Sequence, residues 1–192
     1  MVTKRAFIFL VALGISGISV YAKSKSQTGT SSVSMNDAQF LRKAAEGGMA
    51  EVQMGQLAQE KASNKDVKDF GKHMVDDHSK ANDELKSLAS QKNVTVPDSL
   101  NAKDKATYDR LSKLSGDQFD REYMRVMVKD HETDVAEFRR ESKTAKDPDV
   151  RSFASKTLPT LEEHLKMARD IAAKVGAVTS KETTKGHSAR KY

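Results

Sequence analysis

The chain has no cysteine, and this absence excludes several kinds of chemistry at once. No disulfide can cross-link the fold, no lipid can attach through a thiol, and no thiolate can bind a metal. Any soft-metal site must therefore use histidine and methionine. Stability must come from core packing alone, which a domain of about 145 residues can supply.

Proline is scarce, with three residues in 192, and no segment alternates apolar and polar residues as a half-buried strand does. Apolar residues instead recur with helical spacing. The pattern predicts an all-α domain with four long helices of about 40 Å each. Ser34, Ser63 and Asp147 are the expected N-caps of three of them. The predicted helices cover residues 36–62, 63–91, 116–143 and 147–175.

The connections between these helices predict how they are arranged. Short links join the first helix to the second and the third to the fourth, which requires antiparallel neighbours. Residues 92–116 form a longer link that contains Pro97 and a short helical segment, 101–114. The sequence therefore predicts a ferritin-like four-helix bundle over residues 36–177, built from two helical hairpins joined by a long crossover containing a short helix.

Long apolar runs are missing except at the N-terminus, where Lys4 and Arg5 precede AFIFLVALGISGISV and the chain continues to VYA at Ala22. This layout predicts a signal peptide over residues 1–22, because the apolar run is shorter than the roughly 20 residues of a membrane span. An uncleaved anchor is the alternative. Residues 23–35 and 178–192 are polar and predict a disordered leader and a disordered basic tail. The mature chain is expected to be exported and to contain no transmembrane span.

The net charge of +6 does not predict a nucleic-acid partner. A nucleic-acid binder concentrates its positive charge on one face of the folded domain. Here the surplus lies near the two ends of the chain, and the helical region is close to neutral. The residues that carry it are Lys4, Arg5, Lys23, Lys25, Lys181, Lys185, Arg190 and Lys191.

Three predicted helices carry a histidine near their middle, in MVDDHSKANDEL, MVKDHETDVAEF and LEEHLKMARDI. These are His78, His131 and His164, and Glu51 has the same place in the first helix. A residue at the middle of a helix stays at mid-height whichever way the helix runs, so one layer should contain all four. Apolar residues three before and seven after each histidine, such as Val75 and Leu85 for His78, indicate that the imidazoles face inward.

Such a layer has more than one interpretation. Three imidazoles with Glu51 as a candidate fourth ligand fit one divalent metal ion, zinc, copper or iron. Asp77, Asp130 and Glu163, each directly before a histidine, would then accept hydrogen bonds from the ligating imidazoles. The alternatives are an interlocking layer of hydrogen bonds, since buried imidazoles need partners, and a pH-sensitive core. His73 is expected at the rim and His187 in the tail, and neither is predicted to be a ligand.

The motifs of enzymes are missing. A di-iron oxidase needs Glu three residues before each of two histidines, where this chain has Val75, Val128 and Leu161. No Ser-His-Asp set, phosphate loop or cofactor fingerprint occurs elsewhere. The sequence therefore predicts no catalytic residues.

Three stretches carry a family resemblance: EVQMGQLAQEKASNKDVKDFGKHMVDDHSKANDELKSLA, FDREYMRVMVKDHETDVAEF and VRSFASKTLPTLEEHLKMA. From Asn36 to Val175 the chain resembles a bacterial family of exported domains of unknown function, grouped with ferritin-like bundles and often named outer-membrane or periplasmic proteins. The resemblance implies the bundle, export and a Gram-negative envelope, with the periplasm as the expected location. It implies no activity.

Two functions follow as expectations. One is divalent-metal binding in storage, buffering or envelope stress protection. The other is a non-catalytic structural bundle that acts through interactions, as a homo-oligomer or with an envelope protein, and whose histidines form a buried hydrogen-bonded layer.

Overall fold

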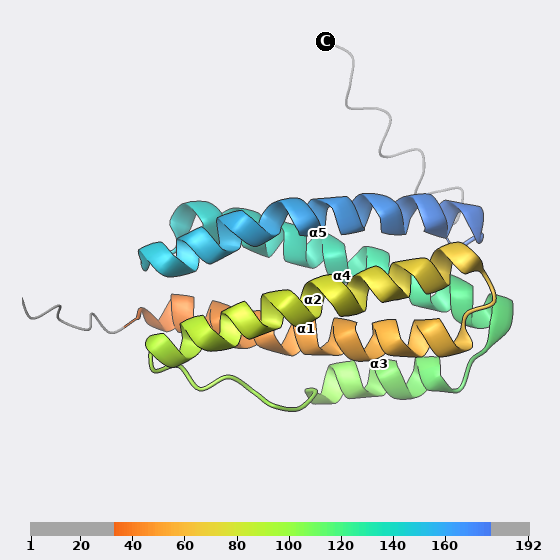
Figure 1. Cartoon of the computed structure of the whole chain (residues 1–192), viewed down its shortest axis with the longest axis horizontal. Helices are drawn as coiled ribbons and strands as arrows, with labels where there is room; N and C mark the ends of the chain where they lie inside the picture. Colours follow the sequence, from red (N-terminus) through yellow and green to blue (C-terminus); the bar gives the residue numbers. More distant parts are fainter. Residues whose placement is uncertain (1–32, 178–192) are drawn as a thin grey trace, which may run out of the picture. The chain divides into compact units, whose positions relative to one another are not determined.

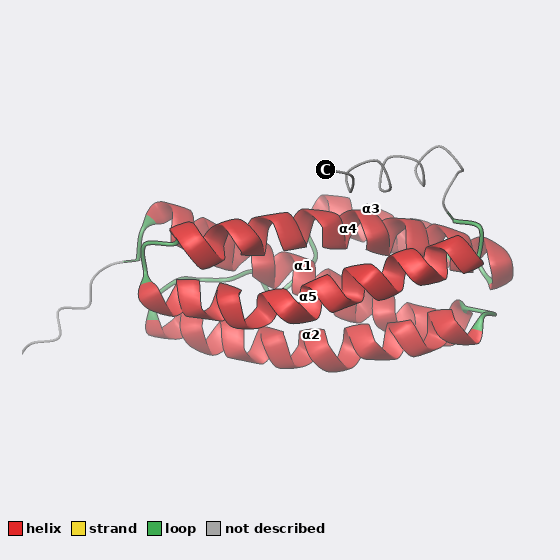
Figure 2. Cartoon of the chain, turned by 90° about the horizontal axis from the view of Figure 1, so that it is seen from above, coloured by secondary structure: helices red, strands yellow, loops and turns green. Residues whose placement is uncertain are grey.

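The structure, a computed structural model of the chain, describes residues 33–177. Within that range it contains five α-helices and no strand (Figure 2). The predicted signal peptide, most of the predicted leader and the predicted basic tail, with His187, lie outside the described residues. The helices are α1 Met35–Lys61, α2 Lys65–Gln91, α3 Ala102–Ser112, α4 Gly116–Thr144 and α5 Pro148–Lys174.

The long helices form two antiparallel hairpins, α1 with α2 and α4 with α5, which pack against each other (Figure 1). The link from α2 to α4 contains α3, which lies along α1. The predicted four-helix bundle of two hairpins with a helix in the crossover is therefore confirmed.

The helix starts follow capping chemistry, with one correction. Ser34 accepts a hydrogen bond from the backbone N–H of Asp37, and Asp147 caps α5 with Pro148 at the first helical position, as predicted. The prediction for Ser63 is wrong, because Asn64 caps α2 by accepting from the N–H of Asp66. Ser63 instead forms hydrogen bonds with α4.

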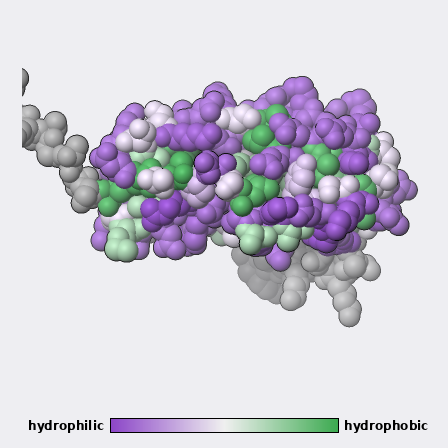
Figure 3. Space-filling model, turned by 90° about the horizontal axis from the view of Figure 1, so that it is seen from below, coloured by the Kyte–Doolittle hydropathy of each residue, from purple (hydrophilic) through white to green (hydrophobic). Residues whose placement is uncertain are grey.

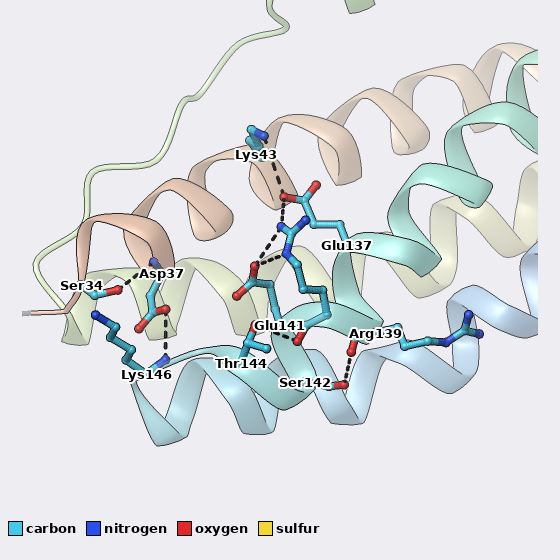
Figure 4. Close-up of polar contacts among 10 residues, drawn as sticks. Ser34, Asp37, Lys43, Glu137, Arg139, Glu141, Ser142, Thr144 and Lys146 are labelled. Atoms are coloured by element: carbon cyan, nitrogen blue, oxygen red, sulfur yellow. Dashed lines mark hydrogen bonds and ion pairs between the residues drawn. The ribbon is translucent and has the colours of Figure 1, made fainter.

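Two buried aspartates hold the hairpins together. Asp37 in α1 accepts hydrogen bonds from the backbone N–H groups of Lys146 and Asp147 in the α4–α5 loop, at 3.2 and 2.8 Å; the first is drawn in Figure 4. Asp120 in α4 accepts from the backbone N–H groups of Ser63 and Asn64 in the α1–α2 loop, at 3.1 and 2.9 Å. Each hairpin thus supplies an acid that binds the loop of the other.

Small residues allow α1 and α2 to approach closely. A Cβ added to Gly55 would lie 2.7 Å from the carbonyl oxygen of Gly71, and one added to Gly71 would lie 2.8 Å from the Cβ of Ala58. Real Cβ atoms do not come that close to other atoms, so both positions require glycine. Small residues of α1 therefore pack against the backbone of α2.

The core consists of two apolar clusters with a polar layer between them. One contains Met54, Phe70, Phe119, Tyr123 and Met127, and the other contains Phe40, Leu41, Leu85, Phe138 and Phe153. The layer between them holds Glu51, His78, His131 and His164, all buried.

The face of the bundle shown in Figure 3 is mostly hydrophilic, with small scattered apolar patches. None of the helices that the structure describes contains a stretch apolar enough to cross a membrane.

Candidate metal centre

The structure brings the four predicted residues of the layer together. Glu51 comes from α1, His78 from α2, His131 from α4 and His164 from α5, and their exposed fractions are 3, 6, 0 and 2%. The centres of the three imidazole rings form a nearly equilateral triangle, with sides of 5.3, 5.5 and 5.7 Å. One residue from each long helix thus contributes to a single buried cluster.

Each imidazole uses one ring nitrogen for a hydrogen bond to an acceptor of the protein. His78 Nδ1 donates to Glu51 Oε2 at 2.9 Å, and His131 Nδ1 donates to the carbonyl oxygen of Met127 at 3.0 Å. His164 Nε2 donates to Asp77 Oδ2 at 2.9 Å. These bonds orient the rings and determine which nitrogen of each ring carries the proton.

The other nitrogen of each ring has no hydrogen-bond partner among the described residues. These atoms are His78 Nε2, His131 Nε2 and His164 Nδ1, and Glu51 Oε1 is unpartnered as well. One nitrogen from each ring lies within 4.8 Å of one from each of the others, and Glu51 Oε1 lies 3.5 Å from His131 Nε2. Four buried polar atoms without a hydrogen-bond partner therefore belong to this one cluster.

This arrangement can be compared with a tetrahedral site. A zinc ion lies about 2.0–2.1 Å from each nitrogen and the ring centre about 1.1 Å further, so ring centres stand about 5.2 Å apart. The observed sides of 5.3–5.7 Å are close to that value. Ligating nitrogens stand about 3.4 Å apart in such a site, and here one nitrogen of each ring lies within 4.8 Å of one from each of the others.

Glu51 is ionised in this environment. Burial opposes ionisation, but the attraction of His78 and His131, together with the hydrogen bond from His78, lowers the pKa of Glu51 to about 2. Burial also opposes the charged form of His78, yet the charge and hydrogen bond of Glu51 raise the pKa of this imidazole. In the metal-free protein, Glu51 and His78 therefore form a buried ion pair.

The other two imidazoles are held neutral. Burial lowers the pKa of His131, with a further contribution from the charge on His78. Burial and the same charge lower the pKa of His164 to about 4, although Asp77 opposes this change. A neutral imidazole is the form that binds a metal ion.

The three acids predicted to accept hydrogen bonds from the imidazoles have different positions. Asp77 is half-exposed and bonds to His164 on the neighbouring helix. Asp130 is partly buried, and burial raises its pKa to about 6. Glu163 is exposed, because the rotation of about 100° per residue that turns His164 inward carries its neighbour outward. The imidazole contacts described above involve neither Asp130 nor Glu163.

Sequence reasoning missed Asp134, which faces Glu51 from α4. Burial and the negative charge of Glu51 raise the pKa of Asp134 well above its usual range. Asp134 follows His131 by three residues and so lies on the same face of the helix. That spacing is the signal that could have found it.

The cluster has one closed side and one hollow side. The ring of Phe70 packs edge-on against His131 and His164, with ring centres 6.2 and 6.3 Å apart. On the other side, a cavity of about 30 Å³ is lined by Glu51, His78 and Asp134 together with residues of all four long helices. Phe70 therefore closes one side of the cluster, and the cavity borders the other side.

Fold and site together define an all-α bundle with a buried cluster of three histidines and one carboxylate. The family model described as "Domain of unknown function (DUF4142)" matches residues 22–171, and the chain belongs to this family. A comparison with the curated proteins gives no match.

Two solved structures share the fold. One is a DUF305 fragment from Deinococcus radiodurans, with 13% identity and a TM-score of 0.66, covering 74% of this chain and 98% of the fragment. The other is described as "putative secreted protein DUF305 from Streptomyces coelicolor", with 15% identity and a TM-score of 0.63, covering 73% and 92%. Both are DUF305 proteins, so the finer label ferritin-like stays a prediction for this chain.

Proposed function

We propose that the protein binds one divalent metal ion through His78, His131 and His164, with Glu51 as the fourth ligand. The observation that carries the proposal is that the two nitrogens of each imidazole ring have different surroundings. One nitrogen of every imidazole bonds to a protein acceptor, and the other has no hydrogen-bond partner among the described residues. This is the pattern of metal-bound histidines, whose second nitrogen donates to a carboxylate or carbonyl.

The rival function, a structural layer of hydrogen bonds, accounts for only half of these contacts. A self-sufficient layer would use both nitrogens of each ring, since a buried unpaired polar atom costs about 1–3 kcal/mol. Here three ring nitrogens and one carboxylate oxygen are left over. A metal ion would satisfy all four atoms at once.

The donor set restricts which metals fit. Three imidazole nitrogens and one carboxylate oxygen suit zinc, copper and iron, and they are poor ligands for magnesium or calcium, which prefer all-oxygen sites. We further propose that the protein is exported and works in the periplasm or envelope, in metal storage, buffering or stress protection. The signal-peptide pattern at residues 1–22 and the description of the Streptomyces coelicolor protein as secreted support export.

The first test is the metal content of the protein purified without chelators or an affinity tag, followed by thermal melts with added zinc, copper or iron. We expect one metal ion per chain and a rise in melting temperature, because a ligand at 100 times its Kd stabilises the folded state by about 2.7 kcal/mol. His131→Ala should lose both the metal and the shift.

The matched control is His73→Ala, which removes an exposed histidine from α2 and should leave metal content and the melting shift unchanged. If the metal-free melting temperature of His131→Ala is too low to interpret, His78→Gln tests the same cluster with a side chain of similar size. Absence of metal and of any shift in the wild type would contradict the proposal.

A further inference from the structure

The two hairpins carry corresponding contacts with a constant offset of 83 residues along the chain. The bounds of α2, Lys65–Gln91, become those of α5, Pro148–Lys174, when shifted by this number. The two aspartates that hold the hairpins together, here called the clamps, correspond as well. Asp37 accepts hydrogen bonds from the backbone of residues 146 and 147, and Asp120 accepts them from the backbone of residues 63 and 64. Since each hairpin binds the other in the same way, a two-fold relation connects them.

The ends of the hairpins obey the same relation. Asn93 after α2 and Gly176 after α5 both have positive φ, 55° and 69°. The next residue in each case returns a hydrogen bond of 2.8 Å to its own helix, from Val94 N to Ala89 O and from Ala177 N to Ala172 O. The offset therefore describes the whole hairpin and is not limited to one contact.

The relation gives each member of the histidine cluster a counterpart. Glu51 corresponds to Asp134, and both residues line the cavity beside the cluster. The three histidines correspond to residues of other types. His131 corresponds to Gly48, His164 to Ala81 and His78 to Leu161.

These three counterparts, Gly48, Ala81 and Leu161, all line the cavity of about 30 Å³ beside the cluster. Gly48 and Ala81 are small, and where imidazole rings stand in the other half this half has the side chain of Asn82, which packs over Gly48, and the cavity. A cavity holds a water molecule once its volume exceeds about 10–15 Å³. The cavity thus lies at the positions that correspond to the histidine cluster under the two-fold relation. It is large enough for one small ligand.

The walls of the cavity suit a ligand that also reaches the metal. Glu51, His78 and Asp134 line it, and the first two are more than nine-tenths buried. Asn82 and Thr157 add neutral groups that can donate hydrogen bonds. Apolar residues complete the wall: Leu85, Phe138, Phe153 and Leu161.

We propose that this cavity is a binding site for a small exogenous ligand of the metal, occupied by water in the resting protein and open to small monoanions. The inference rests on the proposed metal site. A divalent ion with three neutral imidazoles and one carboxylate keeps one positive charge, which a monoanion neutralises. The small volume and apolar walls exclude larger anions.

The experiment uses the full chain loaded with Co²⁺, whose visible absorption reports the number and type of its ligands, and azide as the probe anion. Wild-type protein should bind one Co²⁺ per chain, and its spectrum should change on titration with azide. Ala81→Leu, which places a larger side chain in the cavity, should keep the Co²⁺ and bind azide at least ten times more weakly. Ala136→Leu makes the same change at an exposed position of α4 and should behave as the wild type.

Should Ala81→Leu fold poorly, Ala81→Val adds less volume at the same position and should weaken azide binding in the same direction. A Co²⁺-loaded wild type that does not respond to azide would overturn the small-ligand site and leave the metal site standing. An equal response in wild type and cavity variants would overturn it too. A wild type that takes up no Co²⁺ would overturn both proposals.

Discussion

At the scale of single residues, the layer separates charged from neutral histidines by their neighbours. His78 bonds to the ionised Glu51 and its pKa rises, whereas His164, bonded to the half-exposed Asp77, has its pKa lowered to about 4 by burial and by the charge on His78. Three buried imidazoles could not all be charged, because like charges at these distances repel. The metal-free cluster therefore tolerates one protonated ring and resists a second.

This resistance predicts an effect of pH on stability. The folded pKa of His164 is depressed from 6.5 to about 4, so the unfolded chain takes up a proton in this window and the folded chain does not. Stability should then fall as pH decreases from 6.5 to 4, by roughly 3 kcal/mol for this residue at about 1.4 kcal/mol per pKa unit. His131 acts in the same direction and His78 in the opposite one.

The measurement is urea unfolding of metal-free protein between pH 4 and 7. His164→Gln should lose less stability on acidification than the wild type, since its contribution to the pH dependence is gone. His73→Gln, at an exposed position, should follow the wild type. An unchanged pH profile in His164→Gln would contradict the assignment of a depressed pKa to this ring.

At the scale of elements, α1 shows how identical residues have different roles along one helix. Gly55 meets the backbone of α2, whereas a Cβ added to Gly47 would meet no heavy atom within 4 Å. Both glycines lower intrinsic helix stability by about 1 kcal/mol relative to alanine. Only Gly55 gains close packing in return.

Alanine substitutions at these two positions should therefore have opposite effects on the free energy of unfolding. Gly47→Ala should stabilise by about 1 kcal/mol through helix propensity. Gly55→Ala should destabilise, because its Cβ would lie 2.7 Å from the Gly71 carbonyl oxygen and overpacking costs about 1–3 kcal/mol. Urea unfolding of the pair gives a matched comparison within α1; a stabilising Gly55→Ala would show that the interface can open without cost.

At the scale of the whole molecule, the sequence was sufficient for the bundle and for the level of the histidine layer. Apolar spacing and link lengths determine which helices are neighbours, and counting from helix starts places Glu51, His78, His131 and His164 at mid-height. The facing of Asp134 toward Glu51 could not be predicted in the same way, because it depends on how the two hairpins rotate against each other.

The clamps escaped prediction for a related reason. Asp37 and Asp120 are ordinary acids near helix starts, and local reasoning assigns such residues to capping. Their role depends on loops that lie 109 and 57 residues away in the chain. The 83-residue correspondence is also hidden, since it is carried mainly by matched contacts and only by few identical residues.

The clamps lead to a prediction about how the hairpins are held together. Each aspartate binds two backbone N–H groups, and hydrogen bonds to a charged group contribute about 1.5–3 kcal/mol. Asp37→Ala and Asp120→Ala should each lower the free energy of unfolding by about 2–4 kcal/mol. Asp76→Ala, which removes only an exposed partner of Lys72, should change it by less than about 0.5 kcal/mol.

The double variant distinguishes two equivalent, independent clamps from a single cooperative one. Asp37 and Asp120 lie near the starts of α1 and α4, which run antiparallel, so the clamps hold opposite ends of the bundle and share no partner. Their effects should add to within about 0.5 kcal/mol in urea unfolding. A double variant no less stable than either single one would mean that loss of one clamp already releases the other, and that the two hairpins separate as a unit.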